Sequence, residues 1–274
     1  MKHDPGAKAL REGWNRRQEE FGDAPRAVLM KGVPDAVNLT IDRWHRQVLR
    51  FAFGSWQGHS EPVLDVGCGY GRLGNEALAI GMQALVGIDF SPAFCRRFAT
   101  ACGPAVCGDI SQLSFSTNAF AGAYVVTALM YLDVDRAGAA MRSLDACLAA
   151  GARVLVLEPG AEFNGLVRSL LRHKQDDSLA RPGFTSAEFK TGLVPANWRK
   201  LYSGANAWMT LLFPLLLIAD RRPRLYAAIE RFVLRLDRPV AGRSVFMGRY
   251  ALYRWAVYES GADSGEPGLR STQT

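Results

Sequence analysis

The chain has 274 residues, of which 49% are hydrophobic and 22% are charged, and this composition excludes long disorder and fibrous repeats. The length allows one large domain, or one domain with a sizeable cap. The five cysteines are odd in number and include no Cys-x-x-Cys pair, so we expect neither a disulfide scaffold nor a metal site. Residues 1–20 carry charges without an apolar core, which argues against a secretory signal and favours a cytoplasmic protein.

The net charge of +7 is concentrated in one segment. Residues 62–150 contain five basic and seven acidic residues, whereas residues 220–255 contain nine arginines and three acids. The chain therefore combines a nearly neutral body with a cationic segment. This distribution does not match the broad basic surface of a dedicated nucleic-acid binder, and no nucleic-acid partner is expected.

Residues 1–61 are predicted to form a helical cap, because Ile41, Trp44, Val48 and Phe51 recur at helical spacing within residues 39–53. From residue 62, short apolar runs alternate with amphipathic stretches. Strands are predicted at 61–67, 83–90, 104–109, 120–126 and 152–160, and helices at 72–80, 92–101, 135–149 and 163–173. Connections of helix length require parallel strands, and continuous apolar runs are typical of strands buried on both faces. The body is thus predicted to be an open α/β sheet.

The rest of the chain is predicted to complete this sheet. A loop is expected at 176–183, a short helix at 185–193, a strand at 197–203 and a last strand at 246–258, where aromatic and β-branched residues are frequent. We therefore divide the chain into a cap (1–61), a core (62–204 with 243–258), a helical insertion (205–242) and a disordered tail (259–274).

Three acidic residues follow three consecutive predicted strands. Asp65 lies within Asp-Val-Gly-Cys-Gly-Tyr-Gly, where the first strand enters a glycine-rich turn, Asp89 ends the second strand and Asp109 ends the third. In open parallel sheets the ligand crevice lies outside the carboxyl ends of the strands. A carboxylate at the end of the second strand can accept both hydroxyls of a ribose, so the pattern indicates a nucleotide site.

These motifs, D-V-G-C-G-Y-G, G-I-D-F-S and C-G-D-I, resemble those of class I S-adenosylmethionine-dependent methyltransferases over residues 60–160. The resemblance implies a Rossmann-like, doubly wound seven-stranded sheet with the last strand antiparallel. It also implies that S-adenosylmethionine is the methyl donor and S-adenosylhomocysteine the product.

The resemblance further implies a set of cofactor-binding residues. The methionine moiety would lie along the backbone of Gly67, Cys68 and Gly69. Asp65 would orient this methionine end of the cofactor. Asp89 would hold the ribose hydroxyls, Phe90 would pack on adenine, Asp109 with Ile110 would bind the adenine edge, and Val126 would line the floor. The next family motif matches imperfectly, since Ala121 replaces the usual acid and Tyr131 the usual histidine.

A nicotinamide dehydrogenase is the competing interpretation. Its spacing is Gly-x-Gly-x-x-Gly, whereas here the turn is Gly-x-Gly-x-Gly and an Asp stands two residues before it. An acid beside a pyrophosphate would be repelled, but an acid beside the ammonium and sulfonium of S-adenosylmethionine is favourable. Each acid alone could stand after its strand by chance, because Asp is favoured in loops and at helix N-caps. Such a coincidence is less plausible for all three acids together.

Catalytic candidates are His45, Tyr131 and Glu158. Methyl transfer from a sulfonium requires positioning and desolvation, so a general base is optional. His45 could accept a proton if the cap closes over the cofactor, or could only fill the apolar face of its helix. Tyr131 and Glu158 follow predicted strands at the catalytic rim, but Tyr131 could equally pack and Glu158 could equally bind backbone N–H groups.

The insertion bears on the acceptor. Residues 207–219 carry no charge but are shorter than the roughly 20 residues of a membrane span, and Pro214 interrupts them. In the following amphipathic helix the apolar residues Leu225, Ile229, Phe232, Val233 and Leu236 share one face, and Arg224, Arg231, Arg235 and Arg238 another. Three interpretations are open: a lid packed on the core, a peripheral membrane contact through 207–238, and, least favoured, RNA binding.

The sequence thus predicts a methyltransferase acting on a small, largely apolar metabolite, with oxygen preferred over nitrogen or carbon as acceptor and a role in secondary metabolism. A lipid-linked or membrane-associated acceptor is the alternative. A catalytically silent S-adenosylmethionine-binding module is the non-enzymatic one. Nothing in the sequence indicates the oligomeric state.

Overall fold

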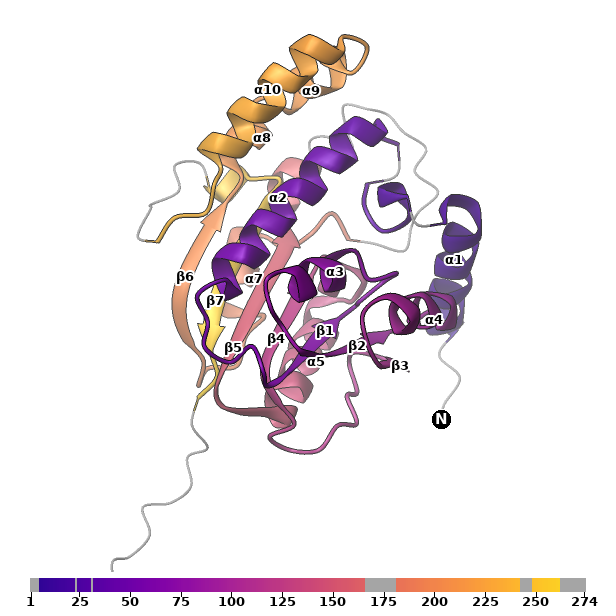
Figure 1. Ribbon diagram of the computed structural model, residues 1–274, viewed down its shortest axis with the longest axis vertical. Coiled ribbons are helices and arrows are strands. Elements are labelled where there is room, and N and C mark those ends of the chain that lie inside the picture. Colours follow the sequence, from indigo (N-terminus) through magenta and orange to yellow (C-terminus); the bar gives the residue numbers. More distant parts are fainter. Residues whose placement is uncertain (1–4, 23, 31, 166–180, 242–247, 262–274) are drawn as a thin grey trace, which may run out of the picture.

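A seven-stranded sheet forms the centre of the computed structural model, which describes residues 5–22, 24–30, 32–165, 181–241 and 248–261 (Figure 1). The strand order is β3-β2-β1-β4-β5-β7-β6. Strands β1 to β5 run parallel, and β7 is antiparallel to both β5 and β6. The bounds are β1 (Pro62–Val66), β2 (Ala84–Asp89), β3 (Ala105–Cys107), β4 (Phe120–Val126), β5 (Leu148–Pro159), β6 (Arg199–Ala205) and β7 (Tyr253–Glu259). The predicted seven-stranded Rossmann-like fold with an antiparallel last strand is confirmed.

Helices cover both faces of the sheet (Figure 1). Several begin at residues whose side chains accept a backbone N–H at the first turn, as at Ser91, Asp133 and Thr185. The bounds are α1 (Pro5–Phe21), η1 (Pro25–Ala27), α2 (Asp35–Phe53), α3 (Arg72–Ala79), α4 (Pro92–Ala101), η2 (Leu129–Tyr131), α5 (Val134–Cys147), α7 (Ser186–Thr191), α8 (Ala207–Leu211), α9 (Phe213–Ala219), α10 (Pro223–Leu236) and η3 (Gly248–Tyr250). Most of the predicted helix 163–173 and of the predicted loop 176–183 lies outside the described residues.

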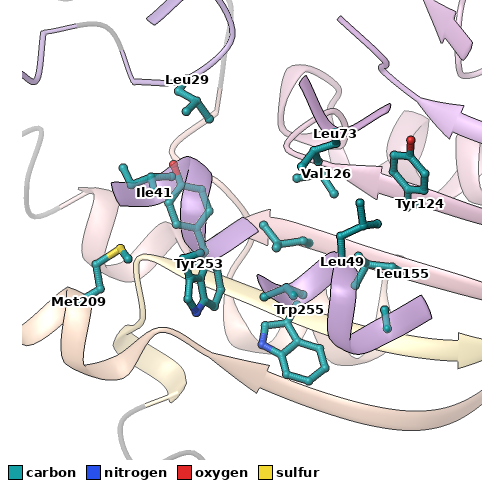
Figure 2. Packing of buried hydrophobic residues seen from close by; sticks show 14 of the residues in the cluster. Leu29, Ile41, Leu49, Leu73, Tyr124, Val126, Leu155, Met209, Tyr253 and Trp255 are labelled. Carbon is teal, nitrogen blue, oxygen red and sulfur yellow. The ribbon is translucent and has the colours of Figure 1, made fainter. Parts of the chain in front are cut away.

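The two faces of the sheet bury separate apolar clusters, because successive strand residues point to opposite sides. On one face, α2 and α3 pack over strand residues such as Val63 and Leu155. Figure 2 shows Leu49, Leu73 and Leu155 of this cluster. On the other face, α5 and α7 pack over Leu64 and Val154. Asp65 therefore has the parity of Val63 and points to the side of α2 and α3, where Tyr124 of β4 also lies.

The insertion consists of three helices beside the N-terminal half of α2 (Figure 1). Pro214 lies in the first turn of α9, and the helical direction breaks at Leu212 between α8 and α9, as the proline predicts. Helix α10 attaches to α2 through Tyr226, whose hydroxyl is 2.7 Å from Thr40 Oγ1, and through Glu230, which accepts a hydrogen bond from Thr40 Oγ1 at 2.8 Å.

Three predicted boundaries need correction. The last strand begins at Tyr253 rather than at 246, because Gly248–Tyr250 forms a 3-10 turn. Strand β5 begins at Leu148, earlier than predicted, because Leu148 pairs with Phe120. The predicted tail also begins too early: the Ser260 hydroxyl donates to the Ala149 carbonyl and accepts from the Ala152 N–H, at 2.7 and 2.8 Å. Residues 262–274 lie outside the described part of the chain.

Candidate active site

A cavity of about 350 Å³ opens at the carboxyl ends of β1, β2 and β4, where the strand order reverses. Its walls include all nine residues that the sequence predicted to bind cofactor: Asp65, Gly67, Cys68, Gly69, Asp89, Phe90, Asp109, Ile110 and Val126. Residues far apart in the chain thus meet in one place. The crevice rule for open parallel sheets, which predicted this position, holds for the described cavity.

The glycine-rich turn brings backbone close to the cavity. Gly67, Gly69 and Gly71 have φ of +76°, +54° and +92°, in a region that residues other than glycine rarely adopt. A Cβ added at Gly67 would lie 2.6 Å from the Ala128 Cβ, so the turn after β1 and the loop after β4 leave no room for one. The turn is therefore specified by both conformation and close packing.

Asp65 is a buried carboxyl at one end of this cavity. It accepts a hydrogen bond from the Tyr124 hydroxyl at 2.9 Å. Burial raises the pKa of Asp65 to about 7, against the opposing effects of the Tyr124 hydrogen bond and the charge of Arg72. The protonation of Asp65 therefore responds to any positive charge that enters the cavity.

Asp89 links the glycine-rich turn to the end of β2. Its Oδ2 accepts the Gly69 N–H and its Oδ1 the Ser91 N–H, each at 2.9 Å. Burial raises its pKa, whereas these backbone hydrogen bonds lower it. The next residue, Phe90, also lines the cavity, and the guanidinium carbon of Arg11 lies 4.6 Å from its ring centroid.

Asp109 lies at the third strand end. Its Oδ1 accepts from both the N–H and the hydroxyl of Ser111 at 2.8 Å, and its Oδ2 lies 3.3 Å from an Arg136 nitrogen. Asp65, Asp89 and Asp109 thus each face the same cavity from consecutive parallel strands. The cavity concentrates three carboxyl groups, with Arg72 and Arg136 as cations in its wall.

Glu158 occupies a different position from the one predicted. It is fully buried and is not among the residues that line the cavity. Its carboxyl group accepts the N–H groups of Ala128, Leu129 and Met130 at 3.0, 2.9 and 3.2 Å. The catalytic expectation for Glu158 is corrected accordingly, because its oxygens hold the loop after β4, the other function that we considered from sequence.

The same loop contains a strained residue. Thr127 has φ of +56°, which is uncommon for a β-branched residue, and it lines the cavity. Its N–H donates to the Leu157 carbonyl at 2.8 Å. Together with the Glu158 carboxyl group, this bond fixes the cavity wall to β5.

His45 lies behind the cavity wall rather than in it. It is completely buried, and its Nδ1 is 3.2 Å from an Arg72 nitrogen, while Arg72 donates to Asp42 at 2.7 Å. Burial and the charge of Arg72 lower the pKa of His45. Within the described part of the chain, its buried Nε2 has no hydrogen-bond partner. Its contacts with Arg72 and with the Tyr253 ring, 4.8 Å away, place it in packing against the wall.

Tyr131 does line the cavity, and its ring centroid is 4.9 Å from that of Trp14 in an edge-on contact. Sequence reasoning missed Trp14, Val28 and Arg72, which also form the wall. Arg72 directly follows the glycine-rich turn, so its position was a usable signal. Trp14 and Val28 come from the N-terminal cap, and no local pattern distinguishes them from ordinary helix-packing residues.

Residues 63–151 match a family model described as "Methyltransferase domain". This range contains the glycine-rich turn and the ends of β1, β2, β3 and β4. The comparison with curated proteins gives no match to the chain.

Three solved structures are similar over nearly the whole chain. One is a magnesium protoporphyrin IX methyltransferase from Synechocystis PCC 6803 with bound SAH, at 12% identity and a TM-score of 0.60, covering 93% of this chain and 99% of that one. A second is the geranyl diphosphate C-methyltransferase from Streptomyces coelicolor A3(2), at 14% identity and 0.57, covering 95% and 99%. A third is the N-methyltransferase NodS from Bradyrhizobium japonicum WM9, at 15% identity and 0.56, covering 92% and 98%. At these identities the likeness establishes the fold.

Proposed function

We propose that this chain, which carries a methyltransferase domain at residues 63–151 and the Rossmann-like fold of S-adenosylmethionine-dependent methyltransferases, transfers a methyl group to a small, largely apolar acceptor. The family and fold predicted from its motifs are confirmed. One observation carries the proposal: three acids at the ends of consecutive strands face one cavity beside a glycine turn that leaves no room for a Cβ.

The cavity residues fit S-adenosylmethionine. When bound, this cofactor supplies a methyl group on an activated sulfonium. Asp65 would face its ammonium, Asp89 the ribose hydroxyls and Asp109 with Ile110 the adenine edge, while Phe90 would pack on the adenine ring. Carboxyl groups favour a cationic ligand, whereas the pyrophosphate of a dinucleotide would be repelled, so the chemistry of the cavity supports a sulfonium nucleotide over a nicotinamide one.

The residues of this chain contribute positioning and exclusion of water rather than an evident base. Trp14, Val28 and Leu132 supply apolar wall, and the hydroxyl of Tyr131 is a group that can form a hydrogen bond with an acceptor hydroxyl. For this reason oxygen is the proposed acceptor atom. Two structural neighbours are named for porphyrin and geranyl diphosphate substrates, which supports a small-molecule acceptor for this chain as well.

Replacement of Asp89 tests the cofactor assignment. Asp89→Ala removes charge-assisted hydrogen bonds worth about 1.5–3 kcal/mol, so calorimetry should show S-adenosylmethionine binding weakened by about tenfold or more. Asp135→Ala is the matched control, because Asp135 is exposed and outside the cavity. An Asp89→Ala protein that folds and binds with unchanged affinity would contradict the ribose assignment.

A second experiment tests turnover. The wild-type protein is incubated with S-adenosylmethionine carrying a labelled methyl group and with a panel of small apolar alcohols, phenols and amines. We expect label in an organic product and formation of S-adenosylhomocysteine, with the labelled atom identified by mass spectrometry. Tight cofactor binding without transfer to any acceptor would instead favour a silent binding module.

A further inference from the structure

The insertion exposes an apolar stripe that the rest of the described chain leaves uncovered. Trp208 and Leu211 are three residues apart on α8, and Leu215 and Ile218 are three apart on α9, so each pair lies on one side of its own helix. Their exposed fractions are 38%, 54%, 48% and 74%. A helix that packs fully on a core would bury such residues.

Helix α10 continues this stripe. Leu225 and Phe232 are 46% and 48% exposed, and the Phe232 ring is in edge-on contact with Trp208 at 5.9 Å between centroids. Tyr226 and Val233 make the buried contacts of α10, so a lid packed on the core does not account for Leu225 and Phe232. The exposed apolar residues of α8, α9 and α10 adjoin through the Trp208–Phe232 contact and through the packing of α9 on α10, and we call them the hairpin patch.

The charges around the hairpin patch have one sign. The exposed charged side chains of residues 207–238 are all arginines, namely Arg221, Arg222, Arg224, Arg231, Arg235 and Arg238. The segment has three acids, of which Asp220 is half-buried at the end of α9, where its charge acts on Tyr226. The other two make contacts within the fold. Glu230 is turned toward α2, where it pairs with Arg43 and accepts from Thr40, and the buried Asp237 accepts the N–H groups of Trp208 and Met209.

The arginines flank the patch along its length. Arg224 and Arg231 each precede an exposed apolar residue, Leu225 and Phe232, by one position, which is about 100° around a helix. Arg235 lies one turn beyond Arg231 on the same side. An apolar face bordered by long cationic side chains is the arrangement of helices that lie in a bilayer interface, where arginines reach the phosphates and apolar residues enter the acyl boundary.

We propose that the hairpin patch docks on the surface of an anionic lipid bilayer. Among the described residues no helix is long and apolar enough to cross a membrane, so the contact would be peripheral. Figure 1 shows α9 and α10 at one extremity of the molecule, beyond α2, where a flat surface can approach them. A second copy of the chain is a poorer occupant, because a symmetric contact would bring two arginine rows together. A polyanion such as RNA would leave the apolar stripe without a function. The proposal does not depend on methyl transfer.

Vesicle sedimentation tests the proposal. The full chain is mixed with vesicles of phosphatidylcholine and phosphatidylglycerol, or of phosphatidylcholine alone, and should sediment with the anionic vesicles only. Each arginine near an anionic surface contributes about fivefold to binding, so Arg231→Gln with Arg235→Gln should lower the partition coefficient by roughly 30-fold. Ile218→Asp should lower it by more than about tenfold, because it places a charge in the apolar stripe. The matched control is Arg96→Gln with Arg142→Gln, which neutralises two exposed arginines outside the insertion.

Circular dichroism and cofactor affinity establish that each variant folds. Sedimentation lost in both hairpin variants and kept in the control supports the proposal. No sedimentation of the wild-type protein with anionic vesicles would overturn it, and so would binding that resists Ile218→Asp, which indicates a polyanion site. Dimerisation in analytical ultracentrifugation that Ile218→Asp abolishes, without vesicle binding, would show that a second copy covers the patch.

Discussion

Cofactor affinity should depend on pH through Asp65. Burial raises the pKa of Asp65 to about 7 in the free protein, so about nine-tenths of this group is protonated at pH 6 and about one-tenth at pH 8. An opposite charge placed beside a carboxylate lowers its pKa by about 1–3. Binding of a cationic cofactor at Asp65 therefore requires release of the proton at pH 6, but hardly at pH 8.

The size of this effect follows from linkage. A carboxyl group whose pKa falls from about 7 to about 5 on binding makes the cofactor bind about tenfold more tightly at pH 8 than at pH 6, or about 1.4 kcal/mol. Calorimetry of S-adenosylmethionine binding between these pH values measures it once the titration of the cofactor's own α-ammonium, whose ordinary pKa is about 7.7–8.0, is subtracted. That titration is common to the wild-type protein and to a variant without the Asp65 carboxyl group. The same titrations in buffers of different ionisation enthalpy should show a proton released at the acid end.

Two variants isolate the contribution of Asp65. Asp65→Asn should bind S-adenosylmethionine more weakly than the wild-type protein at pH 8. Its affinity should vary by less than about threefold between pH 6 and pH 8. Tyr124→Phe removes a hydrogen bond that favours the charged form and lies outside the cavity lining, so it should move the midpoint of the pH dependence upward. Equal affinity at pH 6 and pH 8 in the wild-type protein, or an unchanged slope in Asp65→Asn, would refute the placement of the cationic end at Asp65.

Three further predictions concern the supports of the cavity. Gly67→Ala should abolish measurable cofactor binding, because the added Cβ would lie 2.6 Å from the Ala128 Cβ and the backbone φ is positive. If calorimetry shows that the variant keeps the wild-type affinity, this reasoning is wrong. Glu158→Ala leaves the buried N–H groups of Ala128 and Leu129, and the part-buried one of Met130, without their acceptor. At about 1–3 kcal/mol for each buried group, urea denaturation should show that the free energy of unfolding falls by about 2–6 kcal/mol, and a fall below about 1 kcal/mol would contradict this prediction. Asp42→Asn leaves the charge of Arg72 without its buried partner, so the free energy of unfolding in the same assay should fall by about 3–5 kcal/mol. An unchanged urea midpoint would show that Arg72 is solvated.

Local patterns predicted the fold and the acidic side of the cavity. Five apolar runs separated by connections of helix length favour parallel pairing, and the carboxyl ends of parallel strands meet at one edge of the sheet. The sequence therefore predicted that Asp65, Asp89 and Asp109 lie close together, and the structure shows them around one cavity. Their roles toward the cofactor stay predictions until binding is measured.

Tertiary packing determined what the sequence could not. Trp14 and Val28 reach the cavity only because the N-terminal cap folds over it, a contact between segments that no short motif encodes. His45 and Ile41 look alike as members of one helix face, and only the position of Arg72 shows what the imidazole contacts. The exposure of Phe232 was equally hidden, since an amphipathic pattern predicts an apolar face without saying what covers it.

Thr127 shows how the loop opposite the glycine turn keeps its shape. A threonine in the left-handed region carries a conformational penalty of about 1–3 kcal/mol, yet the Leu157 carbonyl on one side and the Glu158 carboxyl group on the next three residues hold it there. A glycine at this position would remove the conformational strain but would give the loop backbone more freedom to move. The strained threonine thus costs some stability and is held by fixed partners, and a fixed cavity wall would suit the proposed methyl transfer, in which donor and acceptor must stay aligned.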